Sequence, residues 1–391
     1  MTRVESEIDR LEDEFAAEDN SERKYSGINP GEGEISQDFR SEEHILFDKA
    51  VQYLNGEGVT QDYAKAEELF RKSIELSKES YGEEDIYAAL AYFSTGGKYR
   101  EHEDYETAIS YYKDALAVYN KVYDKSDQDI TDTFCLLGIC YEALGDNENA
   151  VKYFIDTAES DIEVHGKDNE NLGIYYNQIS ACYVKLNNFQ NALKYSMDAL
   201  AIRERVLGKD HLDTANVYFQ IAGIYYMQED NQSAISYFEK ACKANEKNNG
   251  RDHSNTADIY FNIADCYYNL KNYGKALEND LTALSIRKKI CEENAPELSL
   301  SYNNVGSTYR VLGKCDEAIE YHIKALELRK KHSEHKDTVA FAYNNIGKDY
   351  EAKSDKENAR KYYNEALSIY KSLEGFEDDA ENAKQSVMRN E

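Results

Sequence analysis

The small, aromatic and polar positions of this chain recur with a period of 42 residues. A fixed period of this length indicates a repeat architecture. The clearest row is Ala66, Ala108, Ala150, Ala192, Ala234, Ala276 and Ala318, followed by Ala359 after 41 residues. A second small residue comes seven positions after each of these alanines. Because a spacing of seven returns to the same face of a helix, the two rows predict a helix with one close-packed seam per repeat.

Another helix is predicted ahead of each seam. Twelve residues before the seam alanine lies a further small residue, namely Gly96, Gly138, Ser180, Ala222, Ala264, Gly306 and Gly347. An aromatic residue comes four positions before each of these, and a tyrosine three positions after. Offsets of three and four share one helical face. Turn-like segments such as LNNF and LKNY separate the two patterns, so each unit is expected to be a pair of antiparallel helices.

This constellation resembles the tetratricopeptide repeat, which places an aromatic residue, an aliphatic residue, Gly or Ala, Tyr, Ala, an aromatic residue and Ala at these spacings. The match recurs seven times over residues 84–374. It implies an all-α, right-handed superhelix (an α-solenoid) of about eight helix-turn-helix repeats. The period is longer than the ordinary 34 residues and resembles the repeats of kinesin light chain and its relatives. The proline of that pattern is replaced by Leu212 and Ser254, and we do not interpret the chain as a motor subunit.

The two ends of the chain depart from this pattern. Residues 1–40 contain twelve acidic and five basic residues and predict a mostly disordered arm with a possible short amphipathic helix. Residues 41–80 resemble a Sel1-like repeat through YLNGEGVTQDYAKAEELFRKSIEL, although a degenerate first repeat acting as a cap explains them equally well. Residues 376–391 predict a polar helix that caps the last seam, as terminal repeats require.

Composition and charge narrow the classes of function. Of the 34 Tyr, 22 occupy four positions of the repeat, so the tyrosine excess follows from the repeat itself. The 75 acidic and 46 basic residues give a formal charge of −29, which disfavours nucleic acid and anionic membranes as partners. The sequence contains no apolar run of membrane-spanning length, and its N-terminus has no leader pattern. We therefore expect a cytoplasmic protein.

Catalytic and metal chemistry has no support in the sequence. Cys140, Cys182 and Cys266 occupy one repeat position and predict core residues, because stacked repeats hold them too far apart to share a metal. His211 and His253 recur 42 residues apart in GKDH and GRDH, which predicts capping of a repeated turn. No phosphate-binding glycine loop or nucleophile motif is present. We expect no enzymatic activity, no cofactor and no metal.

The resemblance implies a binding groove lined by the first helix of each repeat, at the positions three before, one after and four after its small residue. The candidate peptide-binding residues are Asn177, Phe219, Tyr226, Phe261, Tyr268, Asn303, Arg310, Asn344 and Lys348. The aromatic residues could anchor a partner, and asparagine amides can pair with a peptide backbone. In kinesin light chain relatives an asparagine contacts cargo backbone, which carries over to Asn303 and Asn344; the alternative is that these asparagines solvate the groove or bond to the next repeat. Arg310 and Lys348 favour an acidic or C-terminal carboxylate at that end.

The favoured hypothesis is a non-catalytic scaffold that binds a peptide or partner protein in this groove. Two alternatives remain open. The chain could be a regulator that changes pitch when it binds a signalling peptide, or a self-assembling solenoid in which the arm of one chain lies in the groove of another. In every case the expected partner is a protein or peptide, neutral or basic, and neither nucleic acid nor membrane.

Overall fold

The structure, a computed structural model, describes residues 41–82, 86–123, 127–167, 169–292, 295–331 and 336–390. The predicted acidic arm, residues 1–40, lies outside the described residues. Regular secondary structure in the described ranges is entirely helical. The helices are α2 (Glu42–Asn55), α3 (Tyr63–Tyr81), α4 (Ile86–Glu101), α5 (Tyr105–Val122), α6 (Gln128–Ala143), α7 (Asn147–His165), α8 (Asn171–Lys185), α9 (Phe189–Val206), α10 (Leu212–Met227), α11 (Asn231–Asn249), α12 (Ser254–Asn269), α13 (Tyr273–Ile290), α14 (Pro296–Val311), α15 (Cys315–Lys331), α16 (Lys336–Ala352), α17 (Lys356–Tyr370) and α18 (Glu377–Arg389).

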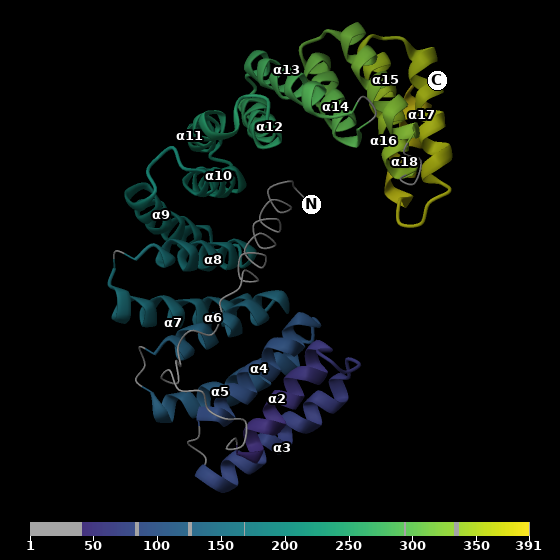
Figure 1. The fold of residues 1–391 in the computed structure, drawn as a ribbon. Helices are drawn as coiled ribbons and strands as arrows, with labels where there is room; N and C mark the ends of the chain where they lie inside the picture. Colours follow the sequence, from purple (N-terminus) through teal and green to yellow (C-terminus); the bar gives the residue numbers. More distant parts are fainter. Residues whose placement is uncertain are drawn as a thin grey trace. The chain divides into compact units, whose positions relative to one another are not determined.

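Consecutive helices form antiparallel hairpins, from α2 with α3 to α16 with α17 (Figure 1). The helices group into two compact units. Unit 1 ends at Val206 with α9, and unit 2 begins at Leu207 and contains α10 to α18. Within each unit, every hairpin packs on the next one along the chain. The predicted all-α solenoid of about eight helix-turn-helix repeats is therefore confirmed.

A repeated turn joins the two helices of a hairpin. In the turn between α10 and α11, the Asp230 carboxylate accepts a hydrogen bond from the Ser233 amide at 3.1 Å and so caps α11. The preceding residue, Glu229, has φ 62°, a region that non-glycine residues rarely adopt. The Asp230 amide donates to the Tyr225 carbonyl at 2.9 Å, which ties the turn back to the end of α10. The cap satisfies an amide that the start of a helix would otherwise leave without a partner.

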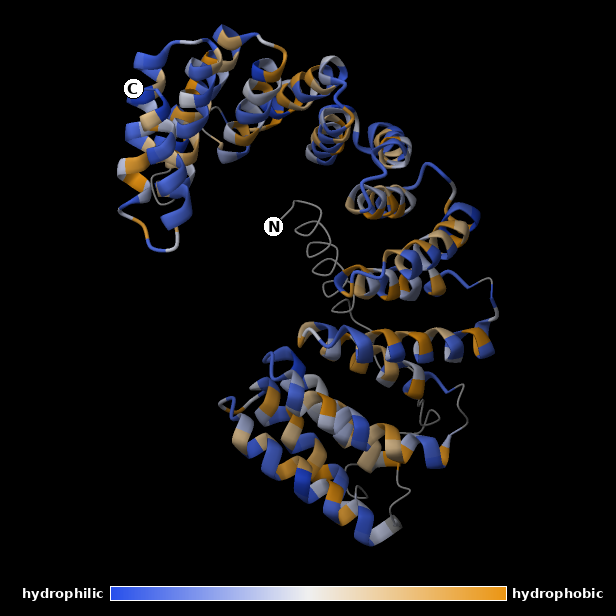
Figure 2. Cartoon of the chain, turned by 180° about the vertical axis from the view of Figure 1, so that it is seen from behind, coloured by the Kyte–Doolittle hydropathy of each residue, from blue (hydrophilic) through white to orange (hydrophobic). Residues whose placement is uncertain are grey.

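Small residues on the first helix allow the second helix to approach closely. A Cβ atom added to Gly138 of α6 would lie 2.7 Å from the Phe154 ring of α7. Tyrosine pairs flank this contact, as where Tyr141 and Tyr153 stack with ring centroids 5.5 Å apart. The seam alanines listed above are at most 1% exposed. Hydrophobic and hydrophilic residues accordingly alternate around each helix (Figure 2), as expected for amphipathic helices that bury one face.

Two smaller predictions are also confirmed. The recurring cysteines Cys140, Cys182 and Cys266 are fully buried core residues. His211 caps α10, since its Nδ1 accepts a hydrogen bond from the Asp213 amide at 3.2 Å. His253 caps α12 in the same way through the Asn255 amide, also at 3.2 Å. The two histidines thus shape the repeated turn between one hairpin and the next.

The first and last elements differ from the central hairpins. Between α2 and α3, Gly56 and Gly58 both have φ 73°, which glycine adopts without strain. This agrees with a special turn, while the Sel1-like character of the segment stays a prediction. At the other end, α18 packs on α17 and buries Ala383. Arg389 at the end of α18 reaches back to α16, where its Nε lies 3.1 Å from Glu351 Oε1.

Candidate functional site

The site predicted from the sequence lies mostly in unit 2, on the first helix of each hairpin. We define the first-helix face of unit 2 as the residues three before, one after and four after the small residue of α10, α12, α14 and α16. These are Phe219, Gly223, Tyr226, Phe261, Asp265, Tyr268, Asn303, Ser307, Arg310, Asn344, Lys348 and Glu351. Asn177, the remaining predicted residue, is half-buried on α8 of unit 1.

The aromatic members of this face have unequal exposure. Phe219 is half-buried and packs edge-on against Phe238 of α11 with centroids 5.2 Å apart. Tyr226 and Tyr268 are half-buried as well. Phe261, in contrast, is only 9% exposed, and the Arg287 guanidinium lies 5.4 Å from its ring centroid. Phe219, Tyr226 and Tyr268 can therefore offer surface to a partner, whereas Phe261 chiefly contributes to packing.

The asparagines also differ. Asn303 is 8% exposed, and its Oδ1 accepts a hydrogen bond of 2.8 Å from Asn345 Nδ2 of the next hairpin. This is the alternative that the sequence left open for Asn303, a bond across to the next repeat. Asn344, which occupies the same repeat position on α16, is half-buried, and no hydrogen bond of its side chain is found within the described ranges. The amide of Asn344 is the one that a peptide backbone could use.

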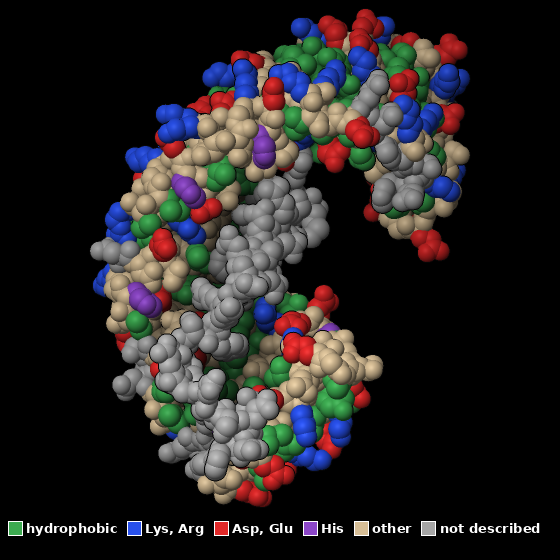
Figure 3. Space-filling view, in the orientation of Figure 1, with side chains coloured by type: hydrophobic (Ala, Val, Ile, Leu, Met, Phe, Trp, Pro, Cys, Tyr) green, Lys and Arg blue, Asp and Glu red, His purple; other side chains and the backbone are tan. Residues whose placement is uncertain are grey.

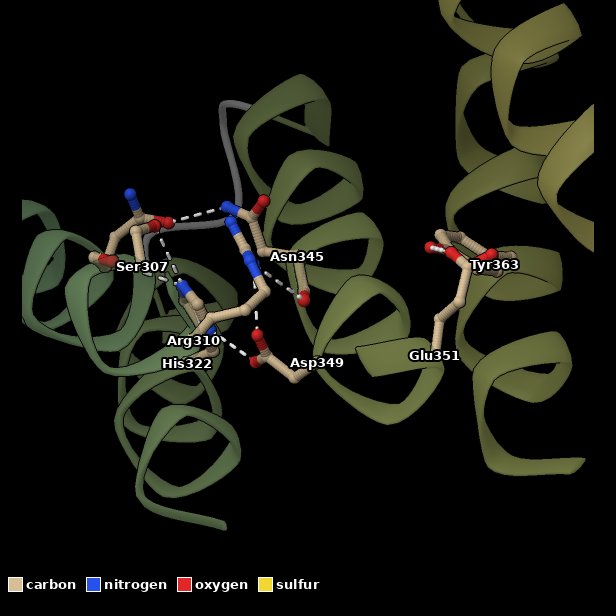
Figure 4. A network of polar contacts seen from close by, with 8 residues as sticks. Ser307, Arg310, His322, Asn345, Asp349, Glu351 and Tyr363 are labelled. Carbon is tan, nitrogen blue, oxygen red and sulfur yellow. Dashed lines mark hydrogen bonds and ion pairs between the residues drawn. The ribbon is translucent and has the colours of Figure 1, made fainter. Parts of the chain in front are cut away.

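Arg310 belongs to a buried polar network that links α14, α15 and α16 (Figure 4). Its Nη1 lies 3.0 Å from Asp349 Oδ1, and Asp349 is completely buried. The Asp349 Oδ2 faces His322 Nδ1 at 2.5 Å, and His322 is also completely buried. The other ring nitrogen of His322, Nε2, lies 3.1 Å from the Asn303 carbonyl oxygen. The same Nε2 also lies 3.4 Å from the Ser307 hydroxyl oxygen, which can donate or accept a hydrogen bond.

This network fixes the guanidinium of Arg310 while leaving its side chain 20% exposed. The Arg310 guanidinium and the His322 ring then share the single carboxylate of Asp349. Lys348 on α16 is exposed, and the described residues provide it with no ion pair. Although the residue as a whole is exposed, partial desolvation of its ammonium group and the neighbouring charge of Arg310 lower the pKa of Lys348. The end of the face near α14 and α16 therefore carries positive charge that the chain only partly balances.

The middle of the face carries the opposite charge. Asp265, one position after the small residue of α12, has a half-buried carboxyl group whose pKa is raised by burial to about 6. Asp280 of α13 is 5% exposed and accepts a hydrogen bond of 2.8 Å from the Thr308 hydroxyl of α14. Burial raises the pKa of Asp280 to about 7, and the charge of Asp265 adds to the rise. Neither carboxylate was among the predicted site residues.

Asp280 and the polar network around Asp349 have a signal that the sequence does contain. The position four after the seam alanine is aromatic in most repeats (Phe70, Tyr112, Phe154, Phe238 and Tyr363), but it is Asp280 and His322 in two repeats of unit 2 and Ser196 in one repeat of unit 1. The position two after the small residue is cysteine in several repeats but Thr308 and Asp349 here. Comparing repeats in register, rather than reading each motif alone, would have shown both departures.

Many charged residues elsewhere on unit 2 are exposed, and the two signs are mixed. Lys289 pairs with Asp252 at 2.8 Å, and Lys353 pairs with Asp316 at 2.6 Å, all four well exposed. Figure 3 shows basic and acidic side chains interspersed over the visible surface of α13 to α17. Exposed pairs of this kind contribute little to stability. Within the described ranges, no group of three or more His, Cys, Asp or Glu is arranged to hold a metal ion, and no helix there is both long and apolar enough to cross a membrane.

The family follows from the sequence comparison. A sequence model described as tetratricopeptide repeat matches residues 59–121, 129–205, 176–247 and 297–372, and a second one with the same description matches residues 257–289. The chain belongs to the tetratricopeptide repeat family. Tetratricopeptide repeats generally serve as non-catalytic scaffolds for protein interactions. The comparison with curated proteins found no match.

Solved structures of tetratricopeptide repeat proteins are similar to this chain in fold. One is a signal transduction ATPase with numerous domains and a tetratricopeptide repeat sensor from Pyrococcus horikoshii, with 17% identity, TM-score 0.57 and coverage of 88% of this chain and 50% of that one. Another is the C-terminal part of a tetratricopeptide repeat protein from Cytophaga hutchinsonii, with 17% identity, TM-score 0.53 and coverage of 73% and 98%. A kinesin light chain with nearly identical repeats from Podospora anserina has 15% identity, TM-score 0.48 and coverage of 53% and 99%.

Proposed function

We propose that this tetratricopeptide repeat protein is a non-catalytic scaffold that binds an extended peptide, or an extended segment of a partner protein, along the first-helix face of unit 2. The observation that carries the proposal is the free hydrogen-bonding and charge capacity of Asn344 and Lys348 on α16. Asn344 is half-buried and Lys348 exposed, and both side chains lack a hydrogen-bond or ion-pair partner within the described ranges. An asparagine amide offers one acceptor and two donors, which match a peptide bond.

The half-buried aromatic residues of α10 and α12 support the same proposal. Phe219, Tyr226 and Tyr268 are all partly accessible, and Phe219 and Tyr268 pack against rings of their own hairpins. Rigid, amphipathic side chains make good interface anchors because little conformational entropy is lost when they bind. A face with anchors at α10 and α12 and polar groups at α16 suits a chain that lies across several repeats.

The test compares two pairs of substitutions of the same residue types on neighbouring helices. Asn344→Ala with Lys348→Ala removes the free polar groups of the face, and Asn364→Ala with Lys361→Ala removes an exposed Asn and Lys from α17. A displayed library of random ten-residue peptides is selected on the wild-type protein, and the affinity of the most enriched peptide is measured for all three proteins. We expect the α16 pair to weaken binding about tenfold or more, since both polar contacts are lost, and the α17 pair to leave it unchanged.

Two outcomes of this selection would contradict the proposed function. Enrichment of no peptide, or equal affinity for the wild-type protein and the α16 pair, would remove the proposal. Unchanged helical circular dichroism of both variants excludes loss of fold as the cause. Regulation by a signalling peptide and self-assembly through residues 1–40 stay predictions, the second because the arm lies outside the described residues.

A further inference from the structure

Asp265 is an unusual residue for its position on the first-helix face. The same repeat position holds the uncharged Ile139, Ala181, Gly223 and Ser307 in other repeats, and the oppositely charged Lys348 on α16. The side chain of Asp265 is only partly exposed. No hydrogen bond or ion pair of its carboxylate is found among the residues that the structure describes. A carboxylate withdrawn from water without a partner is unfavourable in its charged form.

Two tyrosines lie beside this carboxylate. Tyr268 is three positions further along α12 and therefore on the same side of the helix as Asp265. Tyr226 comes from α10, and its pKa is influenced by the side chain of Asn269, the residue four positions after Asp265. The charge of Asp265 contributes to the raised pKa of both tyrosines, which burial raises most. The charge of Asp265 is therefore felt by two aromatic side chains of the first-helix face, one from each of two neighbouring hairpins.

Two arginines of unit 2, Arg287 and Arg310, are already paired with carboxylates other than Asp265. Arg287 lies 2.6 Å from the Asp258 carboxylate and donates to the Ser301 hydroxyl at 2.6 Å. Arg310 is held by the buried carboxylate of Asp349 at 3.0 Å. The buried carboxyl group of Asp280 on α13 makes the local potential still more negative when it is ionised. Within the described ranges the Asp265 carboxylate therefore has no ion-pair partner, so a cation supplied by a ligand can pair with it.

We propose that Asp265, flanked by Tyr226 and Tyr268, forms a subsite for a lysine or arginine side chain of the bound peptide. This rests on the proposed function and specifies its ligand. A cationic head placed between the rings pairs with the carboxylate and is attracted to the aromatic faces, both of which strengthen when water is excluded. An extended peptide that presents a basic residue to α12 can place an acidic side chain or its terminal carboxylate near Lys348 on α16. The first-helix face would then favour peptides whose basic and acidic groups follow one another in one direction along the peptide chain.

The experiment uses the full chain and the displayed library of random ten-residue peptides. Peptides enriched on the wild-type protein are expected to share a lysine or arginine at one position. The most enriched peptide is then synthesised twice, once with arginine at that position and once with citrulline, which has nearly the same shape but no charge. For the wild-type protein, replacing arginine by citrulline should raise the Kd of the peptide by about tenfold or more. For Asp265→Asn, the two peptides should bind with equal Kd.

Asp379→Asn is the matched control, because it removes one charge from an exposed position on α18. It should preserve the full preference for arginine over citrulline. Enriched peptides without a common basic position, or an arginine preference that survives in Asp265→Asn, would overturn the subsite while leaving the scaffold intact. A selection that enriches no peptide would overturn the subsite and the proposed function together.

Discussion

In unit 1 the contact between successive repeats is apolar, as where the Phe154 ring of α7 packs with Ile179 and Cys182 of α8. In unit 2 Phe238 and Cys266 keep an apolar pair at the same two repeat positions, but the next two pairs along the chain are polar. There the counterparts of Phe154 and Cys182 are first Asp280 with Thr308, and then His322 with Asp349. The backbone arrangement of the hairpins is nevertheless the same in both units, with a small residue on the first helix beneath a larger side chain of the second.

The comparison shows that the repeat requires a small residue beneath a larger side chain, and that the contact between repeats can be either apolar or polar. Apolar contacts depend on volume and are weakly directional, so a ring can shift within its pocket. Buried hydrogen bonds and ion pairs depend on direction and become costly when one partner is lost. Unit 2 therefore has repeats whose relative register is fixed by specific atom pairs. The same pairs hold Arg310 in place on the first-helix face.

The largest effect is expected for Asp349→Ala in unit 2. It leaves Arg310 and His322 without their shared carboxylate, and loss of one partner from a buried charge network typically costs about 3–5 kcal/mol of the free energy of unfolding. Urea denaturation followed by circular dichroism measures the loss. Hydrogen exchange in α14 to α16 shows whether it is local.

The informative counterpart is the double substitution His322→Phe with Asp349→Cys, which copies the Phe154 and Cys182 pair of unit 1. Replacing a buried ionic pair by apolar groups of similar volume is often neutral or stabilising. We expect the double variant to recover most of the stability that Asp349→Ala loses. A double variant as unstable as Asp349→Ala would show that the polar contact cannot be exchanged for an apolar one.

A pH-dependent effect of intermediate size is expected for Asp280→Asn. The pKa of Asp280 is raised to about 7 from an unfolded value of 3.8, so the folded state favours the protonated form. The stability from this group is fully present below pH 4 and is lost as the pH rises through 7. Asparagine keeps an acceptor for Thr308 without the charge. The variant should therefore exceed the wild type by up to about 4 kcal/mol at pH 8 and match it near pH 4, as measured by urea denaturation at both values.

A matched substitution in the same position of unit 1 makes the control for this prediction. Phe154→Leu alters packing without a titrating group, so its destabilisation should be the same at pH 4 and pH 8. If the stability difference between Asp280→Asn and the wild type is also independent of pH, the raised pKa of Asp280 has no part in the stability of unit 2.

The smallest effects are expected for alanine in place of the small residues beneath these side chains. An added Cβ would lie 2.7 Å from the Phe154 ring at Gly138 and 2.9 Å from the His322 ring at Gly306. Although the first distance is shorter, Phe154 can shift among apolar neighbours, while His322 is tied to Asp349 and Asn303. Gly138→Ala should cost about 1 kcal/mol and Gly306→Ala about 2–3 kcal/mol. Thermal unfolding compares the two, and the reverse order would mean that the hydrogen bonds do not restrain the ring.

Much of the fold could be predicted because the repeat signal is local. The spacing of three, four and seven residues between small and aromatic positions predicts helices, and the 42-residue period predicts their pairing. The turn caps at His211 and His253 were predictable for the same reason, since a cap contacts residues two or three positions away. The candidate site was less predictable. Phe261 and Asn303 occupy face positions by spacing, yet Arg287 covers the first and Asn345 binds the second.

The sequence by itself determined the helical hairpins, the small-residue seam and the family, because these depend on patterns within one repeat. Only the tertiary structure decided which side chains of the first-helix face remain available. Asn345 lies 42 residues from Asn303, and Asp349 lies 27 residues from His322, so whether such groups meet depends on how one hairpin packs on the next. Charge and hydrogen-bond capacity left over after that packing, at Asp265, Asn344 and Lys348, define what the face can bind.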